Sequence, residues 1–337
     1  IAPTKIRGIL VSLFQLLITV GILASFISDY LIADNTNVES WRPMFYVGII
    51  PAIILLVGVI FLPETPRWLL SRGRNAEGRK VLERIEDPEL VDAAMAQMEE
   101  ELEKDKDQAG WSEVFKPWMR NALIIAVGIM FVQQFVGINT VIYYSPKIFL
   151  TAGFVGNEGS IAPSIIVGVV NVAFTIVSLF LIDKIGRRKI YFIGTIGIVF
   201  SLILMGLSFA MADSLGDMSK WFLVGSMLIY IAFFAISLGP LGWLIISEVF
   251  PTRVRGVGAS IGSLSNWGFN TLVVWTFFKL NGMFQGMLGH DGGVFWFFGV
   301  IGVLGIIWGY KYIPETKGVP LEKIEEHWRQ GKAPNTL

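Results

Sequence analysis

Long apolar runs separated by short polar stretches dominate the pattern of this chain. Each run is long enough to cross a bilayer, which takes about 20 mostly apolar residues in a helix. The weak alternation over short segments that is typical of transmembrane β-barrels is not seen. The pattern predicts an all-α membrane protein with eight transmembrane helices, over residues 9–28, 45–62, 122–150, 161–182, 190–212, 221–246, 257–278 and 294–313.

Residues 69–118 interrupt this pattern. They are rich in Glu, Asp, Lys and Arg, and Leu, Ile, Val and Met recur among them at helical spacing. Such spacing is typical of short amphipathic helices. We therefore expect a cytoplasmic helical linker domain here, with a merely solvated linker as the alternative.

The composition agrees with a membrane protein. Of the 337 residues, 53% are hydrophobic and 16% are charged, whereas about a quarter of the residues in soluble domains are charged. The formal net charge is zero, so the charge balance indicates no nucleic-acid partner. Cysteine is absent, which excludes disulfides and thiolate metal sites. His290 and His327 have no neighbours at metal-ligand spacing, so we expect no metal and no cofactor.

Basic residues fall on one side of the predicted helix hairpins. By the positive-inside rule this is the cytoplasmic side, and both ends of the chain are then predicted to be cytoplasmic. Lys220 and Lys279 are isolated exceptions on the other side. The basic residues that set the orientation include Lys5, Arg7, Arg67, Arg72, Arg74, Lys184, Lys189, Arg253, Lys311 and Lys317.

Two short sequences recur at the cytoplasmic ends of the runs. Residues 3–8 match 251–256, and residues 63–65 match 314–316, so each pair of matches brackets two runs. The second half of the chain holds six runs, and the first half holds the counterparts of only the last two. We therefore expect four further helices ahead of Ile1, in two six-helix halves of the major facilitator type, with the site between the halves near the bilayer midplane.

This arithmetic divides the chain into four parts. Residues 1–68 would be the last two helices of the N-terminal half, and 69–118 the linker domain. Residues 119–318 would be the C-terminal six-helix half, and 319–337 a cytoplasmic tail.

Polar side chains cluster inside the third run, in the stretch QQFVGINTVIYYSP over residues 133–146. An unpaired amide in hydrocarbon costs several kcal/mol, so these groups must face a water-filled cavity or other protein. Amides both donate and accept hydrogen bonds, which suits a neutral polyhydroxylated solute. Gln134 and Asn139 would lie about 140° apart on a straight helix, so Gly137 predicts a break between them. The alternative is that the amides only tie helices together.

Four motifs together resemble the sugar porter family of the major facilitator superfamily, which includes glucose facilitators and bacterial sugar–proton symporters. The resemblance covers essentially the whole chain and implies a carrier, not an enzyme, that moves a hexose or pentose across the plasma membrane by alternating access. Its partners would be the sugar, a coupled proton and the lipid bilayer, and the protein would be monomeric. The motifs are Pro63–Trp68, Gln133–Asn139, Asp183–Arg188 and Pro314–Gly318.

The resemblance also implies which residues contact the sugar. Trp243 follows Gly239 and Pro240, which should loosen the helix, and an indole packs well on the C–H face of a sugar ring. Helix packing is an alternative role for Asn171. Tyr143 would help to close an outer gate, or would belong to an interfacial aromatic belt. The implied sugar contacts are Gln15, Ile18, Gln133, Gln134, Asn139, Tyr143, Asn171, Trp243 and Asn270.

Charged residues at the cytoplasmic helix ends are predicted to form gating ion pairs. A carboxylate that faces two guanidiniums makes charge-assisted bonds, and in the family such clusters latch the cytoplasmic face when the carrier opens outward. Positive-inside topology alone would explain the arginines but not the acids. The predicted gating residues are Glu64, Asp183, Arg187, Arg188, Glu248, Arg255 and Glu315.

Proton coupling needs an acidic residue at membrane depth. None of the eight runs has one in mid-span, and in the family's symporters this acid lies on the first helix, which we expect to precede this chain. Ala235 stands where glucose facilitators carry glutamate, which favours the bacterial branch. We therefore favour sugar–proton symport, with a facilitator or a transporter-like sugar sensor as alternatives.

Overall fold

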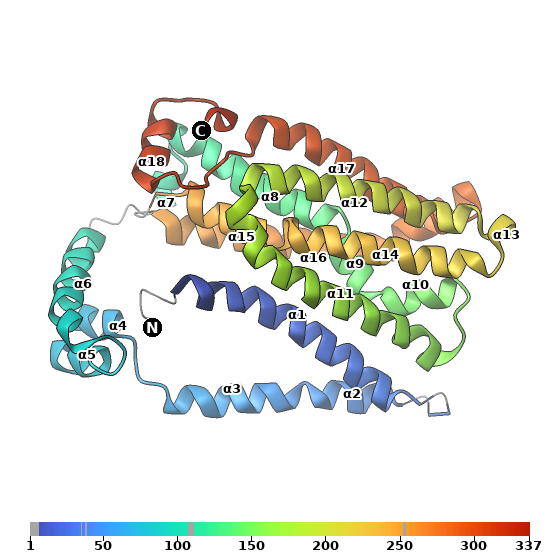
Figure 1. Ribbon diagram of the computed structural model, residues 1–337, viewed down its shortest axis with the longest axis horizontal. Coiled ribbons are helices and arrows are strands. Elements are labelled where there is room, and N and C mark those ends of the chain that lie inside the picture. Colours follow the sequence, from blue (N-terminus) through green and yellow to red (C-terminus); the bar gives the residue numbers. More distant parts are fainter. Residues whose placement is uncertain (1–6, 35, 38, 107–110, 252–253) are drawn as a thin grey trace. The chain divides into compact units, whose positions relative to one another are not determined.

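A computed structural model describes residues 7–34, 36–37, 39–106, 111–251 and 254–337. The regular elements in these ranges are all helices (Figure 1). Contacts divide the chain into two compact units. The first unit comprises residues 1–15 and 39–109, and the second comprises 16–38 and 110–337. Helix α1 (Arg7–Ile32) runs from the first unit into the second.

The first unit contains two apolar helices and a cluster of short amphipathic ones. The side-chain oxygen of Thr65 accepts a hydrogen bond from the Trp68 N–H at 3.2 Å and so caps α4. Leu69, Leu82 and Val91 are buried and form a small core among the short helices. Short helices therefore form between residues 69 and 106, as the spacing predicts, whereas a separate cytoplasmic linker domain over 69–118 stays a prediction. The helices are α2 (Trp41–Val47), α3 (Ile49–Phe61), α4 (Pro66–Ser71), α5 (Asn75–Leu82), η1 (Pro88–Leu90) and α6 (Val91–Lys106).

The second unit is a bundle of long helices, of which α8, α14 and α16 carry most of the site described below. Small residues let these helices approach closely. A Cβ at Gly309 of α17 would lie 2.3 Å from the Tyr191 ring of α12. The elements are α7 (Trp111–Val114), η2 (Pro117–Met119), α8 (Arg120–Phe135), α9 (Ile138–Tyr143), α10 (Ser145–Thr151), α11 (Gly156–Ile185), α12 (Arg187–Ala210), α13 (Ala212–Leu215), α14 (Met218–Ile236), α15 (Leu238–Val249), α16 (Arg255–Leu288), α17 (Gly293–Tyr312), α18 (Leu321–Arg329) and η4 (Pro334–Thr336).

Seven helical segments in the described part of the chain are long and apolar enough to cross a membrane. The expectation of eight is therefore not confirmed. The predicted span over 257–278 forms a helix, α16, but this helix carries Asn266, Asn270 and many glycines and serines, which lower its hydropathy. The seven segments are Gln15–Ile32, Trp41–Phe61, Pro117–Tyr143, Ile161–Ile185, Arg187–Ala210, Met218–Val249 and Gly293–Tyr312.

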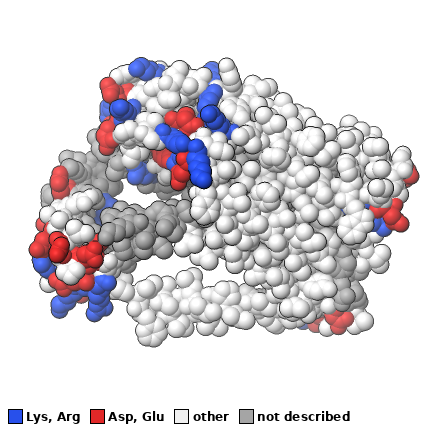
Figure 2. All heavy atoms as spheres, viewed as in Figure 1, with Lys and Arg blue, Asp and Glu red and all other residues white. Residues whose placement is uncertain are grey.

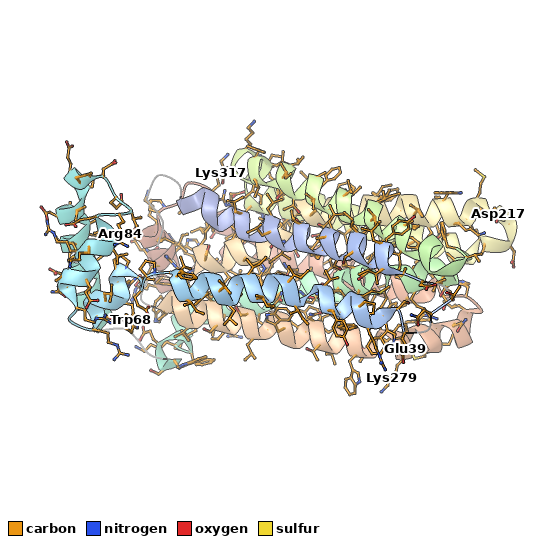
Figure 3. All side chains as sticks on the ribbon, turned by 90° about the horizontal axis from the view of Figure 1, so that it is seen from below. Glu39, Trp68, Arg84, Asp217, Lys279 and Lys317 are labelled. Atoms are coloured by element: carbon orange, nitrogen blue, oxygen red, sulfur yellow. The ribbon has the colours of Figure 1, made fainter. Side chains whose placement is uncertain are left out.

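Charged side chains of the second unit gather at the two ends of the bundle. On the face in Figure 2, the sides of the long helices between these ends are free of blue and red. Lys317 and Asp217 lie at opposite ends (Figure 3). Lys220, one of the predicted exceptions to the charge rule, pairs with Asp217 at 2.9 Å. This arrangement fits helices whose middle parts lie in hydrocarbon.

Candidate functional site

The helical path is interrupted between α8 and α9 at Gly137. The φ of this residue is 87°, in the left-handed region, and a Cβ there would lie 2.5 Å from the Phe298 ring. Only glycine fits both constraints without strain. The break predicted from the sequence is thus confirmed. It brings the side chains of Gln134 and Asn139 together. The Asn139 Nδ2 donates a hydrogen bond to the Gln134 Oε1 at 2.8 Å.

Five amide side chains form a continuous chain of hydrogen bonds around this break. Gln133 Oε1 accepts from Asn266 Nδ2 at 2.6 Å and from Gln134 Nε2 at 3.4 Å. Asn139 Nδ2 also donates to Asn270 Oδ1 at 3.0 Å. Asn139 is half-buried and the other four are buried. We call these five side chains, Gln133, Gln134, Asn139, Asn266 and Asn270, the amide chain. The amide chain therefore connects α8, α9 and α16.

Sequence reasoning missed Asn266, although its signal was present. It lies four residues before Asn270, which places both side chains on one face of α16. Both are buried, with exposed fractions of 7%. Two buried asparagines one turn apart on a helix with few other large polar groups indicate a shared polar lining.

The amide chain leaves polar atoms open. Within the described residues, Asn139 Oδ1 and Asn266 Oδ1 accept no hydrogen bond, and Asn270 Nδ2 donates none. The set thus offers acceptors and a donor together. Because an amide presents both kinds of group, the arrangement can bind a solute whose hydroxyls donate and accept.

A second helix break lies beside the first. α14 ends at Ile236, Ser237 has φ −127° and ψ −96°, and α15 begins at Leu238. The Ser237 hydroxyl donates to the Phe233 carbonyl at 2.6 Å, which satisfies a carbonyl at the end of α14. The loosening predicted around Gly239 and Pro240 is thus confirmed, with the break itself at Ser237, just ahead of both residues.

Side-chain hydrogen bonds run between the two breaks in both directions. From α8, Gln133 Nε2 donates to the carbonyls of Leu238 at 2.6 Å and Gly239 at 3.2 Å. From α14, the buried Tyr230 hydroxyl donates to the Val136 carbonyl at 2.9 Å. Tyr230 therefore supplies a donor to a carbonyl at the end of α8, and Gln133 adds a second donor to two carbonyls in the first turn of α15.

Two further predicted sugar contacts, Trp243 and Tyr143, differ in how they are packed near the amide chain. Trp243 is half-buried on α15, next to Gly242, where a Cβ would lie 2.9 Å from Gln133 Nε2. Tyr143 is 51% exposed at the end of α9. Its neighbour Tyr144 stacks on Phe277 with ring centres 5.3 Å apart. The structure thus packs Tyr144 rather than Tyr143 into the bundle.

Three predicted contacts are not brought into the amide chain. Asn171 is buried on α11, but its amide makes no hydrogen bond within the described part of the chain. Ile18 is 43% exposed on α1. Gln15 is half-buried and belongs to the first unit, so its role beside the other amides stays a prediction.

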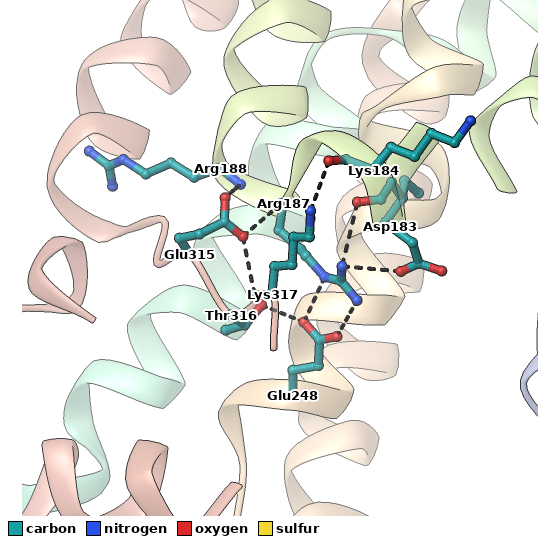
Figure 4. A network of polar contacts seen from close by, with 9 residues as sticks. Asp183, Lys184, Arg187, Arg188, Glu248, Glu315, Thr316 and Lys317 are labelled. Carbon is teal, nitrogen blue, oxygen red and sulfur yellow. Dashed lines mark hydrogen bonds and ion pairs between the residues drawn. The ribbon is translucent and has the colours of Figure 1, made fainter. Parts of the chain in front are cut away.

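At one end of the bundle, Arg187 holds two carboxylates (Figure 4). It makes a two-pronged ion pair with Glu248, at 2.9 Å from Nη2 and 3.3 Å from Nε. Its Nη1 also lies 3.2 Å from Asp183, whose side chain is 79% exposed. The Thr316 hydroxyl donates a further hydrogen bond to Glu248. The predicted cluster of Asp183, Arg187 and Glu248 therefore forms, and with Glu315 we call it the latch.

Glu315 and Arg188 serve helix ends in the latch. Glu315 accepts from the backbone N–H groups of Arg187 at 2.9 Å and Arg188 at 3.2 Å, so it caps the start of α12. Arg188 donates to the carbonyls of Tyr310, at 2.8 Å, and Ile313 at the end of α17. The prediction that Arg188 faces a carboxylate is not met, because its guanidinium takes these carbonyls instead.

The remaining two gating residues stay predictions. Glu64 is exposed and lies in the first unit, whereas the latch lies in the second. Arg255 begins α16 and is half-buried. The latch as described therefore joins elements of the second unit alone.

The family model described as "Sugar (and other) transporter" matches residues 1–328. The chain belongs to this family. It is 38% identical over 330 residues to the glucose transporter GlcP of Staphylococcus epidermidis, covering 98% of this chain and 71% of that protein. It is 35% identical over 335 residues to the D-xylose-proton symporter of Escherichia coli, covering 97% of this chain and 66% of the symporter.

Solved structures give the same result for the fold of this sugar transporter. The major facilitator superfamily proton:xylose symporter XylE bound to 6-bromo-6-deoxy-D-glucose superposes with a TM-score of 0.76 at 34% identity, covering 97% of this chain and 68% of that one. The inward open conformation of XylE from E. coli gives a TM-score of 0.77 at 32% identity, covering 97% and 67%. The chain is thus an integral membrane protein with the major facilitator fold, and its family is one of transporters rather than enzymes.

Proposed function

We propose that this sugar transporter carries a hexose or pentose by alternating access and that the amide chain contacts the sugar. The observation that carries the proposal is the set of open acceptors and donor on Asn139, Asn266 and Asn270. The hydrogen bonds among these amides involve no charged side chain. A charged solute in a buried site needs an opposite charge, so a neutral polyol is favoured.

The two helix breaks support movement around the site. Discontinuous helices at the midplane let one end of a helix tilt without the other. The latch is a contact that can form and separate as a unit, because its carboxylates and Arg187 come from different segments of the chain. We infer that the latch closes the cytoplasmic face, with Asn139 and Trp243 between it and the outer end.

Coupling to protons is supported by the names of relatives. Proteins named D-xylose-proton, arabinose-proton and galactose-proton symporters match this chain at 34–35% identity. A facilitator is the second candidate, because the seven described spans carry carboxylates only near their ends, at Asp29, Asp183 and Glu248. A sugar sensor is the third.

The remaining architecture is proposed from the sequence. α16 would be an eighth span, because it packs along α8 and α17. Four further helices would precede the chain, which the internal repeat favours. Both ends would be cytoplasmic, the protein would be a monomer, and residues 1–68, 69–118, 119–318 and 319–337 would be its parts.

Uptake of radiolabelled D-glucose and D-xylose into vesicles from cells that express the protein tests this proposal. We expect saturable uptake that Gln134→Ala abolishes. Asn121→Ala is the matched control, because Asn121 is an amide on the same helix whose Nδ2 bonds the Lys332 carbonyl, away from the amide chain. Symport predicts faster uptake with an inward proton gradient, and a facilitator predicts no dependence on it. Binding without uptake would indicate a sensor, and uptake unchanged by Gln134→Ala would refute the site.

A further inference from the structure

A cavity of about 230 Å³ lies among α10, α12, α16 and α17, apart from the amide chain. α12 begins at the latch and carries Phe209 near its other end, and Phe209 lines the cavity. α17 begins just after Asp291, which also lines it. The cavity therefore lies at the end of the bundle opposite the latch.

Phenylalanine rings supply most of the apolar lining of the cavity, which we call its floor. Phe277 and Phe295 are buried, with exposed fractions of 4% and 2%. Phe209 stacks on Phe295 with ring centres 5.8 Å apart and an angle of 7° between the planes. Such a floor offers flat aromatic faces, on which the C–H face of a small ring or a polyol can pack.

Polar side chains from three elements surround the mouth of the cavity. Asn281 and Gln285 lie one turn apart on α16, and Asn281 Nδ2 donates to Asp291 Oδ1 at 2.6 Å. Lys147 of α10 and Gln285 are exposed. Within the described residues, neither the Lys147 ammonium nor the Gln285 amide makes a hydrogen bond or an ion pair. The mouth therefore presents open donors and acceptors above an apolar floor.

The size of the cavity selects a small occupant. Its volume equals about eight water molecules at about 30 Å³ each. Sites for drug-sized ligands measure about 300–1,000 Å³. The mouth carries one cation and one anion, Lys147 and Asp291, so their charges offset each other and an ionic ligand gains little. A neutral molecule with several hydroxyls matches the amides, the ammonium and the carboxylate at once.

We propose that this cavity is a second, outer binding site for a neutral polyol of monosaccharide size. It lies wholly within the second unit and shares none of its lining with the amide chain. Phe277 and Phe278 line it and also hold the Tyr144 ring, with ring centres 5.3 and 4.5 Å away. An occupant therefore presses on the rings that fix the junction of α9 and α10, and its binding favours the present position of that junction.

Equilibrium binding of radiolabelled D-glucose and D-xylose to the purified protein in detergent tests the proposal. We expect one class of sites to survive in Gln134→Ala and to be lost in Phe209→Trp, which fills the cavity. Phe200→Trp is the matched control, because Phe200 lies on the same helix but is 54% exposed and outside the cavity. Gln285→Leu, at an exposed position, should weaken the same sites several-fold without affecting folding.

The outcomes separate this proposal from the proposed function. Loss of all binding in Gln134→Ala overturns the outer site and leaves the central one standing. Binding in Gln134→Ala that neither Phe209→Trp nor Gln285→Leu reduces also overturns it. Binding that survives in Gln134→Ala and is lost in Phe209→Trp supports the outer site, whether or not the protein transports sugar.

Discussion

The hydrogen bond from Tyr230 to Val136 can be removed by deleting a single heavy atom, the hydroxyl oxygen of Tyr230. Tyr230→Phe deletes the hydroxyl that donates to the Val136 carbonyl at 2.9 Å and leaves the ring in place. Val136 lies between α8 and α9, and no backbone N–H of the described residues donates to its carbonyl. The variant therefore leaves a buried carbonyl without a donor at the break that positions the amide chain.

Tyr191 provides a matched comparison. Its ring is also fully buried, and its hydroxyl donates to the Gly305 carbonyl at 2.8 Å. Gly305 lies inside α17, where helical geometry gives its carbonyl a second donor four residues later. Tyr191→Phe should therefore cost about 0.5–1.5 kcal/mol, the net worth of a hydrogen bond, whereas a stranded carbonyl costs about 1–3 kcal/mol.

Hydrogen–deuterium exchange of the backbone amides measures the difference locally. A loss of about 1–3 kcal/mol changes an opening equilibrium by about 5- to 150-fold. We expect peptides that cover residues 134–144 to exchange faster by this factor in Tyr230→Phe and to be unchanged in Tyr191→Phe. Equal exchange of these peptides in the two variants would show that the tyrosine does not hold the break and would refute the reasoning.

Three further changes follow from the same contacts. Gly137→Ala forces a side chain into left-handed backbone and against a ring, so we expect a loss of more than about 1 kcal/mol, seen as a melting temperature several degrees lower. Glu315→Gln weakens a charged cap on two backbone N–H groups and should cost about 0.5–2 kcal/mol, whereas Glu322→Gln, at an exposed position, should shift melting much less. Trp328→Phe removes the bond from Trp328 Nε1 to the Val249 carbonyl at 3.0 Å, so limited proteolysis should release the tail faster by about tenfold or less. A tail equally resistant in wild type and variant would contradict that role.

The break at Gly137 was predictable because it follows from geometry alone. Two amides on opposite faces of a straight helix cannot share one solute, and a glycine between them offers the conformation that solves the problem. The partners of those amides were not predictable. Nothing in the sequence near Gln133 indicates that its Nε2 bonds carbonyls more than one hundred residues later, at Leu238 and Gly239.

The predicted span that fails the hydropathy criterion and the site residue that sequence reasoning missed lie on the same helix. Asn266 and Asn270 lower the hydropathy of α16, and they also supply two links of the amide chain. A helix that lines a polar site in a membrane must carry polar groups, so it resembles a transmembrane span less than its neighbours do. Low hydropathy in α16 is thus a consequence of its place in the site.

The sequence predicts that the Arg188 guanidinium faces a carboxylate, because its charge is considered there without the unpaired carbonyls at the end of a neighbouring helix. The last carbonyls of a helix lack intrahelical partners, and at the end of α17 Arg188 supplies the donors. The start of α12 has the converse need, which Glu315 meets. A charged residue beside a helix end in a membrane bundle is therefore as strong a candidate for a cap as for an ion pair.

In the latch and at Val136, a helix end takes its donor or acceptor from another segment of the bundle. Inside a membrane no bulk water replaces such a partner, so a group that caps an end is not free to bind a ligand without releasing it. Gln133 is held in a similar way: its Nε2 donates to the carbonyls of Leu238 and Gly239 in the first turn of α15, and its Oε1 belongs to the amide chain. A sugar hydroxyl that draws Gln133 toward itself must therefore weaken the hold on Leu238 and Gly239, and this competition would couple sugar binding to the tilt of α15.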